Sequence, residues 1–188
     1  MSRDSRKAKI APEAELLVDF VNTRDVEEGT DAIASPAELR RWLDAQGFGD
    51  LAGSAVAGRA HERLLALRES LRALLRANNG GKAEESDLAA LRDAAERCRY
   101  RATVSPDGRL ALDPGGTGPE AFEARLLLAI ERVQARGDWP RLKACPTDGC
   151  QWAFFDTSRN RSRTWCSMEE CGNRVKTRRY RDRRLGRL

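Results

Sequence analysis

The chain has 188 residues, of which 40% are hydrophobic and 34% are charged, and its formal net charge is +5. This length is sufficient for one hydrophobic core and one small additional module. No stretch approaches the roughly 18 apolar residues of a membrane span, and the N-terminal residues lack the apolar segment of an export signal. We therefore expect a soluble, cytoplasmic protein that does not bind membranes.

Helical spacing of apolar residues predicts several helices before residue 140. The segments with this spacing lie near residues 16–23, 36–46, 64–77, 84–98 and 119–136. The second segment has the clearest start, because Ser35 is a suitable N-cap, Pro36 stands at the first helical position and Glu38 completes a capping box. Residues 1–10 are polar and basic, and we expect them to be disordered.

One β-hairpin is expected among these helices. Residues 101–104 and 110–112 alternate in polarity around Pro106-Asp107-Gly108, which is typical of two strands joined by a tight turn. The acidic run 25–31 is predicted to be a loop, and residues 138–140 are predicted to be a hinge. Residues 1–140 are therefore interpreted as a mainly α-helical domain with one β-hairpin, and residues 141–188 as a second, smaller domain.

Four of the five cysteines lie in the last quarter of the chain, in the pairs Cys145-x4-Cys150 and Cys166-x4-Cys171. Each pair can bring two thiolates to one metal ion in a tight turn, and thiols stay reduced in the cytoplasm. Four cysteine ligands close the shell of a zinc ion, so the spacing predicts one structural Zn2+ rather than a catalytic metal. Cys98 continues the apolar spacing of its helix and is assigned to the core.

The C-terminal domain is predicted to be a small treble-clef-like zinc finger composed of a hairpin and a helix. The fifteen residues between the cysteine pairs are long enough to fold back as the hairpin, with Phe154 on the first strand and Trp165 on the return strand. The aromatic residues are assigned to the core of the finger rather than to base stacking. We expect the helix to begin near Glu169 or Cys171.

The positive charge of the chain is concentrated in this finger. Residues 141–188 contain 13 Lys or Arg and 5 Asp or Glu, whereas the remainder has a net charge of −3. A helix formed by GNRVKTRRYRDRRLGR has no apolar stripe, so packing in a core does not explain it. Arg174, Arg178 and Arg181 share one face of this helix, at positions i, i+4 and i+7. This face is predicted to bind nucleic acid, with DNA favoured over RNA.

Three further residues are candidates for the same role: Lys176 on this helix, and Arg161 and Arg163 in the turn region of the predicted hairpin. A basic tail with nonspecific affinity for nucleic acid is the alternative interpretation of these charges. Some of these positive charges could instead stabilise the metal site, because zinc with four thiolates carries a formal charge of −2. Lys143, Arg174 and Lys176 are close enough in sequence to offset that charge.

The residues around the cysteines resemble a known family. Residues 145–165 are CPTDGCQWAFFDTSRNRSRTW and residues 166–176 are CSMEECGNRVK, which is similar to the CGNR zinc finger family, named for the tetrapeptide at 171–174. The segment LLVDFVNTRD at 16–25 resembles the opening motif of the helical ABATE domain, which precedes this finger in bacterial proteins described as putative stress-induced transcription regulators. The resemblance implies a protein that binds zinc and DNA.

Asp19, Asn22 and Arg24 belong to the ABATE-like motif, and they could line a small-molecule pocket or tie down the following loop. We therefore expect a bacterial transcription regulator of the stress response, with an N-terminal domain for sensing or assembly. A small-molecule effector and homo-oligomerisation stay open. The alternatives are an RNA-binding or ribosome-associated zinc module, and a thiol-based redox sensor in which oxidation ejects zinc.

Support for an enzyme is thin, and we expect none. His61 is the single histidine, has no nucleophile or metal motif nearby, and is expected on a helix surface. The glycine-rich loop 114–118 lacks the Lys-Ser/Thr of a phosphate-binding P-loop. An enzyme in the helical domain is the weakest alternative.

Overall fold

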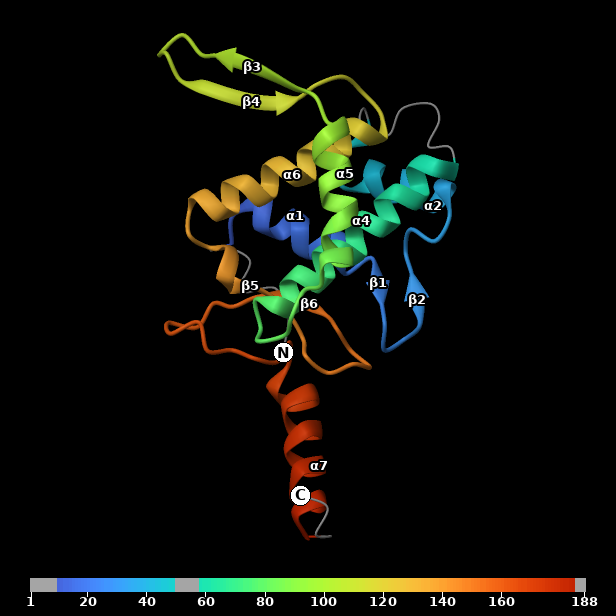
Figure 1. Ribbon diagram of the computed structural model, residues 1–188, viewed down its shortest axis with the longest axis vertical. Coiled ribbons are helices and arrows are strands. Elements are labelled where there is room, and N and C mark those ends of the chain that lie inside the picture. The colour runs from blue at the N-terminus through green and yellow to red at the C-terminus, as the bar shows by residue number, and fades with distance from the viewer. Residues whose placement is uncertain (1–9, 50–57, 185–188) are drawn as a thin grey trace.

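The computed structural model describes residues 10–49 and 58–184, with side chains described throughout these ranges except at 178–180, 182 and 183. The helices of the body are α1 (Pro12–Val21), α2 (Pro36–Ala45), α4 (Gly58–Ala77), α5 (Ala89–Arg97) and α6 (Pro119–Ala135). Another helix, α7 (Asn173–Arg184), extends away from this body (Figure 1). No helix in the described ranges is long and apolar enough to cross a bilayer. The prediction of a mainly helical N-terminal part is confirmed.

The start of α2 follows directly from its sequence. Ser35 Oγ accepts a hydrogen bond from Glu38 N (3.3 Å), and Ser35 N donates one to the Glu38 carboxylate (2.9 Å). This reciprocal capping box is the predicted one, and such a cap contributes about 1 kcal/mol to helix stability. Gly47 follows the helix with a φ of +77°, a conformation that a residue with a Cβ adopts only with strain.

The hydrophobic core lies between α1, α4 and α6. Phe20 of α1 and Phe122 of α6 pack edge to face with ring centroids 5.7 Å apart, and Trp42 of α2 lies 5.9 Å from each ring. Leu67 and Leu71 of α4 are buried in the same core. Each of the fully buried side chains in this core stabilises the fold by roughly 1.5–3 kcal/mol through its burial.

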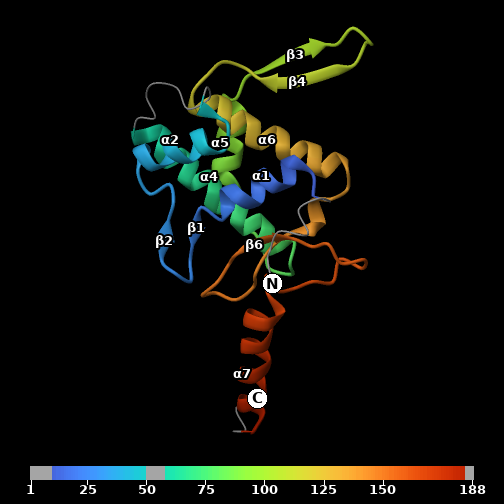
Figure 2. The ribbon, with the colours of Figure 1, turned by 180° about the vertical axis from the view of Figure 1, so that it is seen from behind.

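The strands form antiparallel two-stranded hairpins: β1 (Arg24–Asp25) with β2 (Thr30–Asp31), β3 (Tyr100–Val104) with β4 (Leu110–Pro114), and β5 (Leu142–Ala144) with β6 (Ala153–Phe155). The β3–β4 hairpin, which the sequence predicts, projects from the body at the end opposite to α7 (Figures 1 and 2). In contrast, Leu142, Ala144 and Ala153 of β5–β6 are buried in the core of the helices. One core therefore spans the boundary expected near residue 140, and the division into two domains there stays a prediction.

Three segments differ from the expectation. Residues 25–31, the expected loop, form the β1–β2 hairpin together with Arg24. Residues 138–140, the expected hinge, lie at the 3₁₀ turn η3 (Trp139–Arg141), whose Trp139 packs against the core. No strand returns at Trp165, because residues 156–167 are irregular and β6 pairs with β5, which precedes the first cysteine pair. The finger therefore has the predicted hairpin and helix, but the hairpin lies elsewhere, and the treble-clef-like order is not confirmed. A second 3₁₀ turn, η2 (Glu85–Leu88), leads into α5.

Candidate metal centre and nucleic-acid interface

The four paired cysteines converge on one point. The Sγ atoms of Cys145, Cys150, Cys166 and Cys171 all lie within 4.8 Å of one another. The Cys150–Cys166 and Cys166–Cys171 sulfur distances are 3.5 Å and 3.7 Å. A tetrahedral zinc ion with Zn–S bonds of about 2.3 Å requires sulfur–sulfur distances of about 3.8 Å. The donor set therefore fits one structural Zn2+, as predicted, and Cys98 does not belong to the cluster.

Hydrogen bonds among these thiols shift their pKa values. Hydrogen bonds from Cys150 and Cys166 lower the pKa of Cys145 strongly, because they stabilise its thiolate. The hydrogen bond to Cys145 raises the pKa of Cys150 to about 12. Zinc requires all four groups as thiolates, so binding of the metal must release protons and become weaker as the pH falls.

The first cysteine pair lies at the tip of the β5–β6 hairpin. Cys145 N donates to Trp152 O (2.9 Å), which extends the ladder beyond the strands. Within the turn, Cys150 N donates to Thr147 O (2.9 Å), and Gln151 adopts a φ of +53° directly after the ligand. The turn that presents these two thiolates is therefore an extension of a buried hairpin.

The helical body holds this hairpin by its backbone. Asn22 Nδ2 donates to Ala153 O (2.9 Å), and Ala153 N donates to Asn22 Oδ1 (2.8 Å), so one side chain satisfies both backbone groups. Arg72 of α4, which is 2% exposed, donates to Gln151 O (3.0 Å) and to Val21 O (2.7 Å). Asn22 thus contacts the backbone of β6, which agrees with the structural one of the two roles that the sequence left open.

The C-terminal end of α4 supplies two more clamps. Asn78 Nδ2 donates to the carbonyls of Trp139 and Leu142, both at 2.9 Å. Asn79 Nδ2 donates to Ala144 O (2.9 Å) and to Thr164 O (2.7 Å). The sequence shows these asparagines only as helix-ending residues. Their contacts, 61 to 85 residues away along the chain, fix the zinc finger to the body.

A buried ion pair organises the loop between the two cysteine pairs. Lys143 Nζ donates to Asp156 Oδ2 (2.7 Å) and to the carbonyls of Arg161 (2.6 Å) and Arg163 (3.0 Å). Burial acts to raise the pKa of Asp156, but hydrogen bonds from Lys143 and Ser158 hold it below its usual value. Lys143 therefore bonds to this loop, and no bond to the cysteine sulfurs is found for it in the described structure. These contacts give the loop its irregular path in place of the expected strand.

The two arginines predicted to bind nucleic acid from this loop differ. Arg163 Nε donates to Trp165 O (2.9 Å), its Nη2 donates to Cys166 O, and its guanidinium lies 4.8 Å from the centroid of the Phe154 ring. Its side chain is thus turned inward and positions the third zinc ligand. Arg161 is exposed on the surface of the loop, and its backbone adopts a φ of +54°.

The second cysteine pair leads into α7 through a π-helical turn, η4 (Met168–Gly172). Ser167 Oγ accepts a hydrogen bond from Glu170 N (3.2 Å) and caps this turn. A Cβ on Gly172 would collide with Met168 Sδ and would lie 3.1 Å from Trp165 Cδ1. The glycine of the CGNR tetrapeptide therefore allows Met168 and Trp165 to pack closely beside the metal site.

Helix α7 carries the charge predicted for a nucleic-acid surface. It contains seven Lys or Arg and one Asp, and it projects from the body in both views (Figures 1 and 2). Lys176 and Arg181 are exposed, whereas the side chain of Arg178 lies outside the described part of the chain. Arg174, also exposed, forms an ion pair with Glu27 in the β1–β2 turn (2.7 Å), and this pair raises its pKa.

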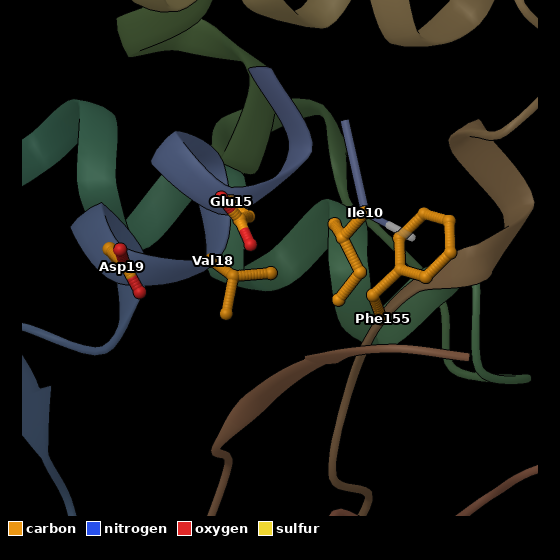
Figure 3. Close-up of a pocket in the computed structure, with 5 residues that line it drawn as sticks. All are labelled: Ile10, Glu15, Val18, Asp19 and Phe155. Carbon is orange, nitrogen blue, oxygen red and sulfur yellow. The ribbon is translucent and has the colours of Figure 1, made fainter. Parts of the chain in front are cut away.

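The other two motif residues do not join Asn22 in one pocket. Asp19 lines a shallow hollow with Ile10, Glu15, Val18 and Phe155 (Figure 3), and its volume of about 100 Å³ is below the roughly 300–1,000 Å³ of small-molecule sites. Arg24 is exposed, with its guanidinium 3.8 Å from Glu69. The three side chains therefore point to different neighbours.

Sequence reasoning missed a buried charge network on α4. Arg68, 2% exposed, donates to both carboxylate oxygens of Asp31 (2.8 and 2.9 Å) and to Thr23 Oγ1 (3.1 Å). These bonds hold the pKa of Asp31 below its usual value, although its burial acts in the opposite direction. The available signal was the position of Arg68 and Arg72 among the leucines of the apolar face of α4.

Two residues outside the metal site are also inside the protein. His61 is buried rather than on the surface, and its Nε2 lies 2.7 Å from Ile33 O. Cys98 is 5% exposed, as the sequence predicts, and burial raises the pKa of its thiol to about 11. Its thiol is therefore protonated near neutral pH and has little reactivity.

Two protein families match consecutive parts of this chain. The CGNR zinc finger matches residues 141–184, which contain all four clustered cysteines and α7. ABATE, with the description "putative stress-induced transcription regulator", matches residues 14–136, which contain the helical body. No curated protein matches the chain. The order of the two families along the chain is the predicted one, and the chain belongs to the ABATE family, with a CGNR zinc finger at its C-terminal end.

Proposed function

We propose that the protein is a DNA-binding transcription regulator that reads duplex DNA with α7. The observation that carries this proposal is a basic helix that projects from the body directly after the last zinc ligand. Its twelve residues span about 18 Å, which suits the major groove of B-DNA. The family description of a transcription regulator and the excess of positive charge agree with this use.

The nucleic-acid surface that we propose consists of Lys176, Arg178 and Arg181 on α7, with Arg161 from the loop in support. Their positive charges would contact phosphates or guanine edges. Arg174 contributes less, because Glu27 already neutralises it. Arg163 is a positioning residue in this proposal, since its guanidinium holds the carbonyls beside Cys166. The zinc ion would fix the start of α7 relative to the body, which is a structural role.

Duplex DNA is favoured over single-stranded RNA by the packing of the aromatic residues. Readers of unpaired bases present exposed aromatic rings on which the bases stack. In this finger, Phe154 is only 6% exposed, and Trp152 and Trp165 pack against the cysteine cluster. A ribosome-associated or RNA-binding role is therefore the alternative that the binding experiment must exclude.

Fluorescence anisotropy with labelled duplex DNA, single-stranded DNA and structured RNA tests the proposal. We expect duplex DNA to bind most tightly, and the slope of log affinity against log salt to flatten by about one unit for each phosphate contact removed. Lys176→Ala, Arg178→Ala and Arg181→Ala should each show this change. Arg109→Ala is the matched control, since Arg109 is 86% exposed but lies on the distant β3–β4 hairpin. Wild-type slopes in all three α7 variants would refute this use of the helix.

A redox role is a second candidate, and the exposure of Cys166 favours it. Cys145, Cys150 and Cys171 are buried, whereas Cys166 is partly exposed and offers an oxidant one accessible ligand. Release of zinc at peroxide concentrations comparable with that of the protein, followed with a chromogenic chelator, would support this role. Retention of zinc at these peroxide concentrations would exclude it.

We place the regulator in the cytoplasm and in the stress response, without a catalytic function. The reducing conditions there keep four thiols available for zinc. The stress response comes from the description of the family alone. The helical body would act as the platform that orients the finger, because its hydrogen bonds to β5 and β6 fix the first cysteine pair.

A further inference from the structure

The β3–β4 hairpin has one face built entirely of uncharged residues. Cross-strand partners point to the same side of a sheet, and so do alternate residues of a strand. The register therefore places three pairs together on this face: Tyr100 with Pro114, Ala102 with Leu112, and Val104 with Leu110. The opposite face carries the pairs Arg101 with Asp113 and Thr103 with Ala111.

This uncharged face is exposed to solvent. Val104 and Leu110 are each 69% exposed, Leu112 is 43% exposed and Tyr100 is 40% exposed. These side chains together expose an apolar area on the order of 400 Å², which is within the range of about 300–600 Å² for the largest, often functional, apolar patch of a monomer. An isolated two-stranded hairpin is only marginally stable in water. The hairpin therefore has both the area and the physical need for a covering partner.

The rest of the described surface shows what could cover it. Among the described residues, the exposed large hydrophobic side chains are these four and Met168, which lies beside the zinc site. Within residues 10–49 and 58–184, a second copy of the chain consequently offers no comparable apolar patch except the same hairpin face. A closed dimer with twofold symmetry uses one patch on both copies, and this face is suited to such pairing because it carries no charge to repel its equivalent.

The charges beside the face do not oppose this pairing. Arg101 lies opposite Asp113 across the strands, and Arg109 is paired with Asp107 at 3.0 Å. An acidic or basic partner would find no uncompensated row of charges here. The hairpin is also held in place from the side of α6, where Arg132 donates to the carbonyl of Leu112 in the middle of β4 (3.0 Å). A second hairpin can therefore approach a surface whose orientation relative to the body is already fixed.

We propose that the uncharged face of the β3–β4 hairpin is a self-association surface, through which two copies of the chain pack face to face. Two such faces bury on the order of 800 Å² in total, less than the roughly 1,200–2,000 Å² of stable complexes, so the dimer is weak and reversible. The hairpin lies at the end of the molecule remote from α7 (Figure 2). Self-association therefore leaves α7 free, and the inference does not depend on the proposed DNA binding.

Sedimentation equilibrium of the full-length zinc-loaded protein, without nucleic acid, tests this surface. Between roughly 1 and 200 µM, the average mass should rise from that of one chain towards that of two, as weak interfaces of this size require. Val104→Lys and Leu110→Lys place a charge in the face and should weaken the dimer at least tenfold. Ala111→Lys is the matched control: Ala111 is exposed on the opposite face of the same strand, and its substitution should leave the dimer within twofold of wild type.

Three outcomes would overturn the proposal. In the first, the wild-type protein stays a single chain at 200 µM, which would leave the face to another partner. In the second, the lysine variants dimerise like the wild type. In the third, the Ala111→Lys control loses the dimer as fully as the lysine variants do. If the variants fail to fold, hydrogen exchange of the wild-type protein still tests the proposal. Hydrogen exchange of residues 100–114 should slow as the protein concentration rises, and an unchanged rate would contradict the inference.

Discussion

The first cysteine pair of the zinc site is part of the helical body, whereas the second pair belongs to the segment that carries α7. Cys145 and Cys150 lie at the tip of a buried hairpin that Asn22, Arg72 and Asn79 hold by its backbone. Cys166 and Cys171 lie in an irregular segment and a π-helical turn, beyond which α7 projects from the body. The same metal ion would thus join a fixed half and a projecting half.

This difference indicates what zinc contributes to the fold. The fixed half has a hydrophobic core and many backbone hydrogen bonds of its own, so it depends less on the metal. The hydrogen bonds and ion pairs described between the projecting half and the rest of the protein include the Asn79 bond to Thr164, the Lys143 bonds to the carbonyls of Arg161 and Arg163, and the Arg174–Glu27 ion pair. For this half, we expect the metal to supply most of the energy that orders it, as in small zinc modules.

The largest expected effect comes from removing a ligand. Cys145→Ser and Cys166→Ser should each reduce bound zinc from one per chain to well below half, because three thiolates no longer close the shell. Cys98→Ser is the control and should retain full zinc, since Cys98 lies outside the cluster. Metal analysis per chain measures this. Equal losses in Cys98→Ser and Cys166→Ser, or full zinc in Cys166→Ser, would contradict the assignment.

Removal of zinc by a chelator should separate the two halves. Hydrogen exchange should become fast in residues 166–184, whereas the amides of β5 and β6 should remain protected by the body. The amide of Ala153, which donates a hydrogen bond to Asn22 Oδ1, is the reference position in the fixed half. Simultaneous loss of protection in both halves would show instead that the metal and the helical core form one cooperative unit.

Substitutions of the anchors should weaken the fixed half. Arg72→Met leaves the carbonyls of Val21, Arg24 and Gln151 without this donor, whereas Glu69 keeps Arg68 as a partner. The free energy of unfolding should fall by about 3 kcal/mol, because each buried acceptor left unpaired costs about 1–3 kcal/mol. Asn22→Ala leaves both backbone groups of Ala153 unpaired and should cost about 1–3 kcal/mol.

Arg76→Ala provides a control for these anchors on the same helix. Arg76 also contacts the first cysteine turn, through Asp148 at 3.0 Å, but Asp148 is 91% exposed. Exposed pairs of this kind contribute about 0–1 kcal/mol. Denaturant unfolding of the three variants measures the difference. If Arg76→Ala proves as destabilising as Arg72→Met, burial does not explain the strength of the anchors.

The smallest expected effect concerns the contact between the body and α7. Glu27→Gln removes the partner of Arg174, so affinity for duplex DNA should rise, by less than about fivefold because both side chains are exposed. Glu28→Gln is the matched control, since it removes the same charge from the neighbouring exposed residue. Anisotropy at low and high salt distinguishes them. An equal rise in DNA affinity in the two variants would show that the loss of a negative charge, and not the loss of the contact with Arg174, causes the effect.

Local sequence was sufficient for the elements whose cause is local. The capping box of Ser35 and Glu38, the hairpin around residues 106–108 and the helical spacing of the leucines of α4 all depend on neighbours within a few residues. The four zinc ligands were also predictable, because two short cysteine pairs need only to meet at one ion.

Only the tertiary structure decided how the finger is attached to the body. Asn22 and Ala153 are 131 residues apart in the chain, and Arg72 and Gln151 are 79 residues apart, so no local pattern reveals that they meet. The expected strand at Trp165 failed for the same reason, since Lys143 and Asp156 hold that loop through contacts across the finger. Spacing in a sequence reports which residues share a helix or strand face, whereas buried polar partners are selected by the packing of distant elements, where an unpaired group would cost free energy.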